Sequence, residues 1–185
     1  MQKSWEEFRK FGAIAVSQDD LQGAEAYWFA ALQAAEAFER TDSRLLISME
    51  DLAVVFWRGA KFVQAEALSL RILSGYHLTV GENHPDVGII KSNLALLYKL
   101  QLKYQESEDH YRQALTILIR CFGFQHPDVR SVRAAYGQLL TLMGREREAK
   151  EICASLAAMS PGRWVRTGSW KTYQNLEGLP DAPTG

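Results

Sequence analysis

Histidine and cysteine are the residue types of this chain best suited to metal binding or nucleophilic attack, and their spacing supports neither. The chain has four histidines and two cysteines. His84 and His126 each open a copy of the same tetrapeptide, His-Pro-Asp-Val, so they belong to separate units and lack a third zinc ligand. Cys121 and Cys153 have no cysteine close in sequence, and we expect both to be small core residues.

The acidic run before His110 is the remaining candidate for chemistry. Glu106 and His110 are one helical turn apart, and Glu108 and Asp109 lie between them. Such a run is typical of a solvated, charged surface. The chain also lacks the HExxH zinc motif, a glycine-rich phosphate loop and the nucleophile elbow of hydrolases. The sequence therefore predicts no enzyme, no metal site and no cofactor.

The composition excludes several classes of partner. Of the 185 residues 47% are hydrophobic and 23% are charged, which is enough apolar material for a packed core. Lys and Arg number 21 against 22 Asp and Glu, so the basic surface of a general nucleic-acid binder is not expected. No stretch approaches the roughly 20 apolar residues of a membrane span, and the start of the chain lacks a signal-peptide apolar region. We expect a cytoplasmic protein that binds neither nucleic acid nor membrane.

A long internal repeat organises the chain, and it identifies the elements that must position any functional side chain. The two His-Pro-Asp-Val copies are 42 residues apart, and this distance is the repeat period. The large, small, large pattern of Leu94, Ala95 and Tyr98 recurs one period before and one period after these residues. An earlier unit fits if one position is dropped. The repeats predict units at about 3–40, 42–81, 84–123 and 126–159, within one repeat domain at 1–159.

Within each unit the apolar residues have helical rather than alternating spacing. Tyr104, Tyr111, Leu115 and Leu118 form one such stripe. Prolines at first helical positions and glycines in turns mark the boundaries. The pattern predicts two helices for each unit and an all-α chain, with helices at about 3–17, 20–39, 43–58, 61–77, 85–101, 103–121, 127–143 and 145–159.

These residues resemble the tetratricopeptide repeat in its 42-residue form, which is typical of kinesin light chains. The clearest unit is 84–123, with His-Pro-Asp-Val, then Asn-Leu-Ala-x-Leu-Tyr, then Lys-Tyr-x-Glu and Tyr-x-x-Ala-Leu. Asp42 stands where that subfamily has histidine, and Ala60 and Leu102 stand where it has a turn glycine. The resemblance implies a right-handed solenoid of about four helix-turn-helix units, with the first helix of each unit on the inner, concave wall.

The family's concave groove binds peptides, and its wall positions can be carried over residue by residue. The resemblance implies a groove formed chiefly by Arg9, Glu50, Asp51, Val54, Trp57, Arg58, Ile89, Asn93, Leu96, Lys99 and Gln138. In related domains an asparagine at the place of Asn93 holds the peptide backbone. The equivalent Lys10, Asp51 and Ala135 are not asparagine, which disfavours a clamp for a terminal carboxylate and favours a segment from within a chain.

Two wall residues have alternatives that the sequence leaves open. Trp57 beside Arg58 has the composition of a binding hot spot, but a tryptophan packed between helices is the alternative. Asn93 either grips a peptide backbone or is a solvated helix residue.

The segment 160–185 differs in composition from the repeats. It contains three of the five prolines and no sustained apolar period, so it predicts a tail rather than a fifth repeat. Its basic and aromatic run, which includes Trp164 and Trp170, has three interpretations: a cover for the last helix pair, a disordered terminus, or a contact for a ligand or partner.

The sequence thus predicts a protein-interaction module that holds a peptide segment of another protein in its groove. One alternative is a chaperone for a specific client protein. The other is a regulatory subunit that assembles with copies of itself. The sequence identifies neither the partner nor its pathway.

Overall fold

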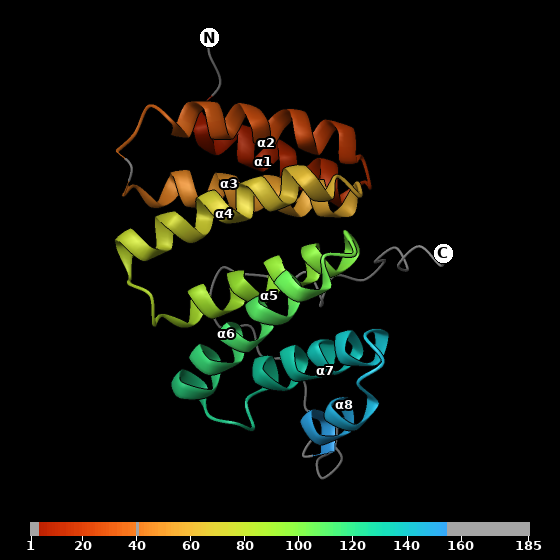
Figure 1. Ribbon diagram of the computed structural model, residues 1–185. Helices are drawn as coiled ribbons and strands as arrows, with labels where there is room; N and C mark the ends of the chain where they lie inside the picture. The colour runs from red at the N-terminus through yellow and green to blue at the C-terminus, as the bar shows by residue number, and fades with distance from the viewer. Residues whose placement is uncertain (1–3, 40, 155–185) are drawn as a thin grey trace. The chain divides into compact units, whose positions relative to one another are not determined.

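The computed structural model describes residues 4–39 and 41–154, and every element in these ranges is a helix (Figure 1). The helices are α1 (Trp5–Ser17), α2 (Leu21–Ala35), α3 (Ser43–Arg58), α4 (Phe62–Thr79), α5 (Pro85–Leu100), α6 (Tyr104–Phe122), α7 (Pro127–Leu142) and α8 (Glu146–Cys153). The predicted all-α repeat of helix pairs is confirmed. The predicted tail, with Trp164 and Trp170, lies outside the described residues.

The helix starts follow from capping residues in the sequence. Ser4 and Glu7 form a reciprocal capping box at α1, and Asp42 accepts a hydrogen bond from the Arg44 amide at α3. At α5 and α7 the Nδ1 atoms of His84 and His126 accept the amide hydrogen bonds two residues on, and proline fills the first helical position. The two histidines therefore cap helices, as expected of residues at the corners between repeats.

The turn inside each repeat contains one residue in the left-handed region. The four residues are Asp19, Ala60, Leu102 and Gly144, with φ of 59°, 55°, 61° and 75°. Successive positions are 41, 42 and 42 residues apart, so the same turn recurs whether or not the residue is glycine. Each turn places the second helix of a repeat beside the first.

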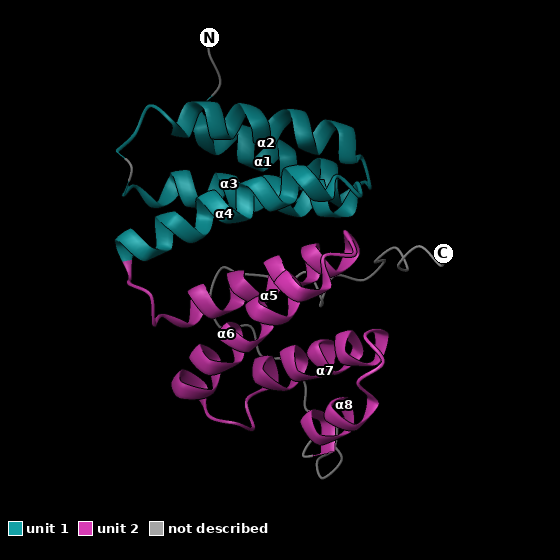
Figure 2. Cartoon of the chain, in the orientation of Figure 1, with its two compact units in different colours: residues 1–79, 178–185 teal, residues 80–177 magenta. Residues whose placement is uncertain are grey.

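The chain divides into two compact units, one ending at Thr79 and the other beginning at Val80 (Figure 2). In the first unit α2 packs against α1 and α3, and α4 packs against α3. In the second unit α6 packs against α5 and α7, α8 packs against α7, and α5 also contacts α7. Each unit thus contains two repeats, and its inner second helix, α2 or α6, packs against the first helices on either side of it.

Small residues allow close helix packing inside the repeats. A Cβ on Gly12 would overlap the Trp28 ring, and one on Gly137 would lie 2.5 Å from the Cys153 sulfur. At the equivalent position of the third repeat, Ala95 and Tyr111 are both fully buried in the core of the second unit. The recurring small residue therefore marks the closest approach of each helix pair.

Candidate functional site

The first helices α1 and α3 are joined directly at predicted wall positions. The Arg9 Nε atom lies 2.6 Å from Asp51 Oδ2, and the Trp5 indole donates a 2.7 Å hydrogen bond to Ser48 Oγ. Asp51 is equivalent to Lys10 rather than to Arg9 in the repeat register, so the pair joins neighbouring wall positions of the two first helices. We call the face formed by α1 and α3 around this pair the Arg9–Asp51 face.

The Arg9–Asp51 pair remains partly open to solvent. The side chains are 36% and 23% exposed, and the Arg9 guanidinium also lies 5.1 Å from the centre of the Trp5 ring. An ion pair of this exposure is worth about 0 to 1 kcal/mol, because water competes for both partners. The pair therefore offers a guanidinium and a carboxylate that another molecule can engage at little cost.

Arg58 is also at the surface of the first unit. Its guanidinium lies 2.7 Å from Asp19 Oδ1, so it links the last turn of α3 to the turn between α1 and α2. Val54, one turn before Arg58 on α3, is half-buried. Among the predicted wall residues of α3, Asp51, Val54 and Arg58 thus retain solvent access.

Two other predicted wall residues of α3 are buried, and this corrects their placement. Trp57 is 2% exposed and its ring lies 5.6 Å from that of Phe62 on α4, so the packed alternative holds. Glu50 is buried and accepts a 2.8 Å hydrogen bond from the Tyr76 hydroxyl on α4. The reason is that α3 packs against both α2 and α4, so its buried arc is wider than a single-faced wall helix would have.

In the second unit the predicted wall residues are divided between interior and surface. Asn93 is only 2% exposed, so the solvated alternative does not hold, and Ile89 and Leu96 are buried as well. Lys99 is half-buried and Gln138 is exposed. Burial lowers the pKa of the Lys99 ammonium, because a desolvated cation favours its neutral form.

The residues with candidate chemistry have structural surroundings that the sequence only partly indicated. Cys121 is exposed rather than in the core, because it lies in the last turn of α6, where its thiol donates to the Asn83 carbonyl. His110 stacks on the Tyr98 ring at 5.2 Å between centroids, so it is not simply solvated. Within the described ranges, no group of three or more His, Cys, Asp or Glu residues is placed to hold a metal ion.

A buried carboxylate in the second unit was missed by sequence reasoning. Glu108 is buried on α6, where it accepts hydrogen bonds from the Tyr136 hydroxyl at 2.8 Å and from Arg145 at 2.5 Å. Lys61 and Glu25 form a 2.6 Å ion pair in the first unit. Lys61 and Arg145 both stand just before the second helix of a repeat. A basic residue thus recurs at the same place two repeat lengths apart, and this recurrence was the sequence signal for a paired carboxylate on the preceding second helix.

The described part of the chain contains no helix long and apolar enough to span a bilayer. A family model described as tetratricopeptide repeat matches residues 60–120 and 86–153, which together span half of the chain. A comparison with curated protein sequences gives no match.

Solved structures share the fold. BtubC (BKLC) from P. vanneervenii superposes with a TM-score of 0.72 at 18% identity, covering 90% of this chain and 69% of that one. The TPR-like repeats of a putative kinesin light chain from P. anserina superpose with a TM-score of 0.73 at 16% identity, covering 85% and 76%. At these identities the likeness concerns the fold.

Proposed function

The chain belongs to the tetratricopeptide repeat family, whose repeats generally mediate protein–protein interaction, and we propose that it binds a peptide segment of a partner protein on the face of its first helices. This proposal assigns binding to α1 and α3 in the first unit and to α5 and α7 in the second. It assigns packing to the second helices α2, α4, α6 and α8.

The observation that carries the proposal is the contact between Arg9 and Asp51. Predicted wall side chains of α1 and α3 meet at 2.6 Å, so the two helices present these polar groups to one shared face. The guanidinium can donate to backbone carbonyls or to a carboxylate, and the Asp51 carboxylate can accept from amides. A polar peptide segment therefore finds both kinds of partner within one pair.

The charges of the second unit support an acidic partner segment there. On α5 and α7 the acidic residues are confined to the first turn, where Asp86 and Asp128 lie. The basic residues of these two helices are Lys91, Lys99, Arg130 and Arg133, of which Arg133 is buried and Lys91 is bonded to Gln113 on α6, so Lys99 and Arg130 are the candidates for this face. The other acidic residues of this unit's helices lie on α6 and α8, and Lys99 forms no ion pair with any described residue. A carboxylate placed beside Lys99 would offset the desolvation of its ammonium.

Peptides selected from a random phage-displayed library against the full chain provide the test. We expect Arg9→Ala and Asp51→Ala each to lower the affinity for a selected peptide by about fivefold or more, as a loss of roughly 1 kcal/mol of binding free energy implies. Lys61→Ala is the matched control, because Lys61 stands just before α4 and forms a 2.6 Å ion pair with Glu25 on α2.

Fluorescence polarisation measures the affinities, and circular dichroism checks that each variant is folded. Equal weakening by Lys61→Ala, or full-strength binding by both face variants, would place the binding site elsewhere. For the second unit, Lys99→Ala should weaken acidic peptides, whereas Lys91→Ala, whose ammonium is bonded to Gln113 on α6, should not.

A further inference from the structure

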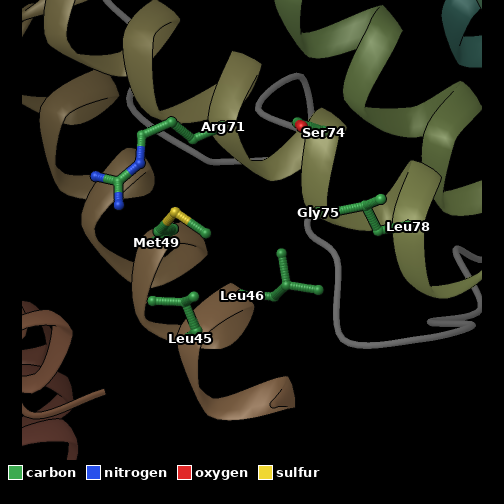
Figure 3. Close-up of a pocket in the computed structure, with 7 residues that line it drawn as sticks. All are labelled: Leu45, Leu46, Met49, Arg71, Ser74, Gly75 and Leu78. Carbon is green, nitrogen blue, oxygen red and sulfur yellow. The ribbon is translucent and has the colours of Figure 1, made fainter. Parts of the chain in front are cut away.

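A pocket of about 280 Å³ opens between α3 and α4 (Figure 3). Leu46 and Met49 line it from α3, and Arg71, Gly75 and Leu78 line it from α4. Met49 and Asp51 are two positions apart, which corresponds to about 200° around a helix. The pocket and the Arg9–Asp51 face are therefore on opposite sides of α3.

The equivalent positions of the third repeat are joined by a polar bridge. There the Lys91 ammonium on α5 donates to Gln113 Oε1 on α6 at 2.7 Å. The residues one period earlier are Met49 and Arg71, which cannot form this bridge. Arg71 instead lies 3.3 Å from Glu36. The second repeat therefore lacks the link that spans the two helices of the third repeat.

The rim of the pocket is also more apolar than the equivalent surface of the third repeat. Leu78 is 70% exposed, although it is a large apolar side chain. Its equivalent in the third repeat is Arg120, which is exposed and polar. Leu78 and Met49 both stand where the third repeat has a basic residue. The second repeat therefore presents an apolar depression where its neighbour presents a hydrated surface.

The charge at the pocket constrains what it can accept. Arg71 is the charged residue of the lining, and both members of its pair with Glu36 are about half exposed. A pair of this exposure and length is easily exchanged for another carboxylate. The volume lies just below the roughly 300 Å³ at which sites for drug-sized ligands usually begin, so one or two side chains suit it better.

We propose that the pocket between α3 and α4 is a second docking site, which binds a partner peptide through a large apolar side chain flanked by an acidic residue. The apolar side chain enters between Leu46, Met49 and Leu78, and the acidic side chain pairs with Arg71. This surface is independent of the first-helix face in the proposed function.

The test selects peptides from a random phage-displayed library on the full chain, with depletion of the library on Leu78→Arg. We expect the enriched peptides to share Leu, Met or Phe with Asp or Glu within one helical turn. A synthetic peptide of this sequence should bind Leu78→Arg at least tenfold more weakly than the parent chain. Val63→Arg is the matched control, because Val63 is 68% exposed on the same helix and does not line the pocket.

The role of Arg71 is tested with Arg71→Gln, which introduces the residue of the third repeat. This variant should bind the acidic peptide severalfold more weakly, and its affinity for a peptide with Asn in place of the acidic residue should be unchanged. Equal effects on both peptides would contradict the charge pairing. Peptides that bind Leu78→Arg and Val63→Arg equally well would overturn the docking site.

Two further measurements distinguish this pocket from the first-helix face and from a dimer interface. Arg9→Ala and Asp51→Ala should not affect the pocket peptide, so failure of the first-helix proposal leaves this result intact, and the reverse also holds. Sedimentation velocity of the full chain, with and without Leu78→Arg, measures self-association. A concentration-dependent dimer that Leu78→Arg abolishes would assign the pocket to a second copy of the chain and would overturn the proposal.

Discussion

The second and third repeats build the same helix pair with exchanged side-chain sizes. In the second repeat Leu46 on α3 faces Gly75 on α4, and a Cβ on Gly75 would overlap the leucine. In the third repeat the equivalent residues are Gly88 and Ile117, and a Cβ on Gly88 would lie 3.3 Å from Ile117 and 2.8 Å from Leu118. The comparison indicates that packing constrains the combined volume across the pair, rather than the residue at either position.

The largest expected effect on stability comes from removing the side chain of Leu46, the large residue of the Leu46–Gly75 pair. We expect Leu46→Gly to lower the free energy of unfolding by about 3 to 5 kcal/mol, because a buried side chain is lost and glycine disfavours the helix. Adding Gly75→Ile to this variant reproduces the third repeat and should recover at least half of the loss. Urea unfolding followed by circular dichroism measures both values. No recovery in the double variant would show that the two repeats are not interchangeable at this contact.

A smaller loss of stability is expected when Gly88 of the third repeat is replaced by leucine, the residue at the equivalent position 46 of the second repeat. Gly88→Leu should cost about 1 to 3 kcal/mol of unfolding free energy, because its side chain must displace Leu118 and Ile117. Ile117→Gly in the same chain should restore part of the stability, since it opens the space that Gly75 provides in the second repeat. Thermal melts can rank the single and double variants. An unchanged midpoint for Gly88→Leu would mean that the contact is looser than the structure has it.

Two buried carboxylates extend the comparison to the polar interior. Glu50 bonds Tyr76 within the second repeat, whereas Glu108 bonds Tyr136 and Arg145 in the following repeat. Burial raises the pKa of the Glu108 carboxyl, but hydrogen bonds from Arg145 and Tyr136 more than offset it, and the net pKa is lowered. A lowered folded-state pKa contributes stability above the unfolded pKa, and this stability is lost as pH falls through the folded pKa.

The smallest expected effect follows from that shift. Glu108→Gln should lose about 1 to 2 kcal/mol of unfolding free energy at pH 7, because charge-assisted hydrogen bonds become neutral ones. Between pH 5 and lower values the parent chain should lose stability more steeply than the variant. Glu106→Gln is the control, since Glu106 is exposed on the same helix. Parallel stability curves for parent and Glu108→Gln would contradict the assigned ion pair.

The sequence predicted the helices and their pairing well, because the repeat period sets the register and capping residues mark the helix starts. His84, Pro85 and Asp86 predicted the start of α5, and the structure confirms it. The direction in which a single side chain points was harder to predict, because a shift of one residue rotates a side chain by about 100° around the helix. Trp57 and Glu50 were assigned to the wall from the family's positions, but Phe62 and Tyr76 on α4 provide partners for both in the interior.

The pocket between α3 and α4 could not be predicted from patterns in a single unit. Gly75 resembles any helical glycine until its position is compared with Ile117, and Met49 resembles any core methionine until it is compared with Lys91. Recognising the pocket requires knowing which residues of the two helices face each other. The contact between Arg9 and Asp51 was easier to anticipate, because both residues were assigned to the wall of adjacent repeats.

The recurring left-handed turn also bears on the order in which the chain folds. For Asp19 and Gly144 this backbone conformation is readily populated before the helices meet, whereas for Ala60 and Leu102 it costs roughly 1 to 2 kcal/mol. The hairpins of the first and fourth repeats can therefore close locally. Those of the second and third repeats depend on helix packing to hold their turns. We expect the chain to order from both ends inward, with the α3–α4 and α5–α6 hairpins closing last.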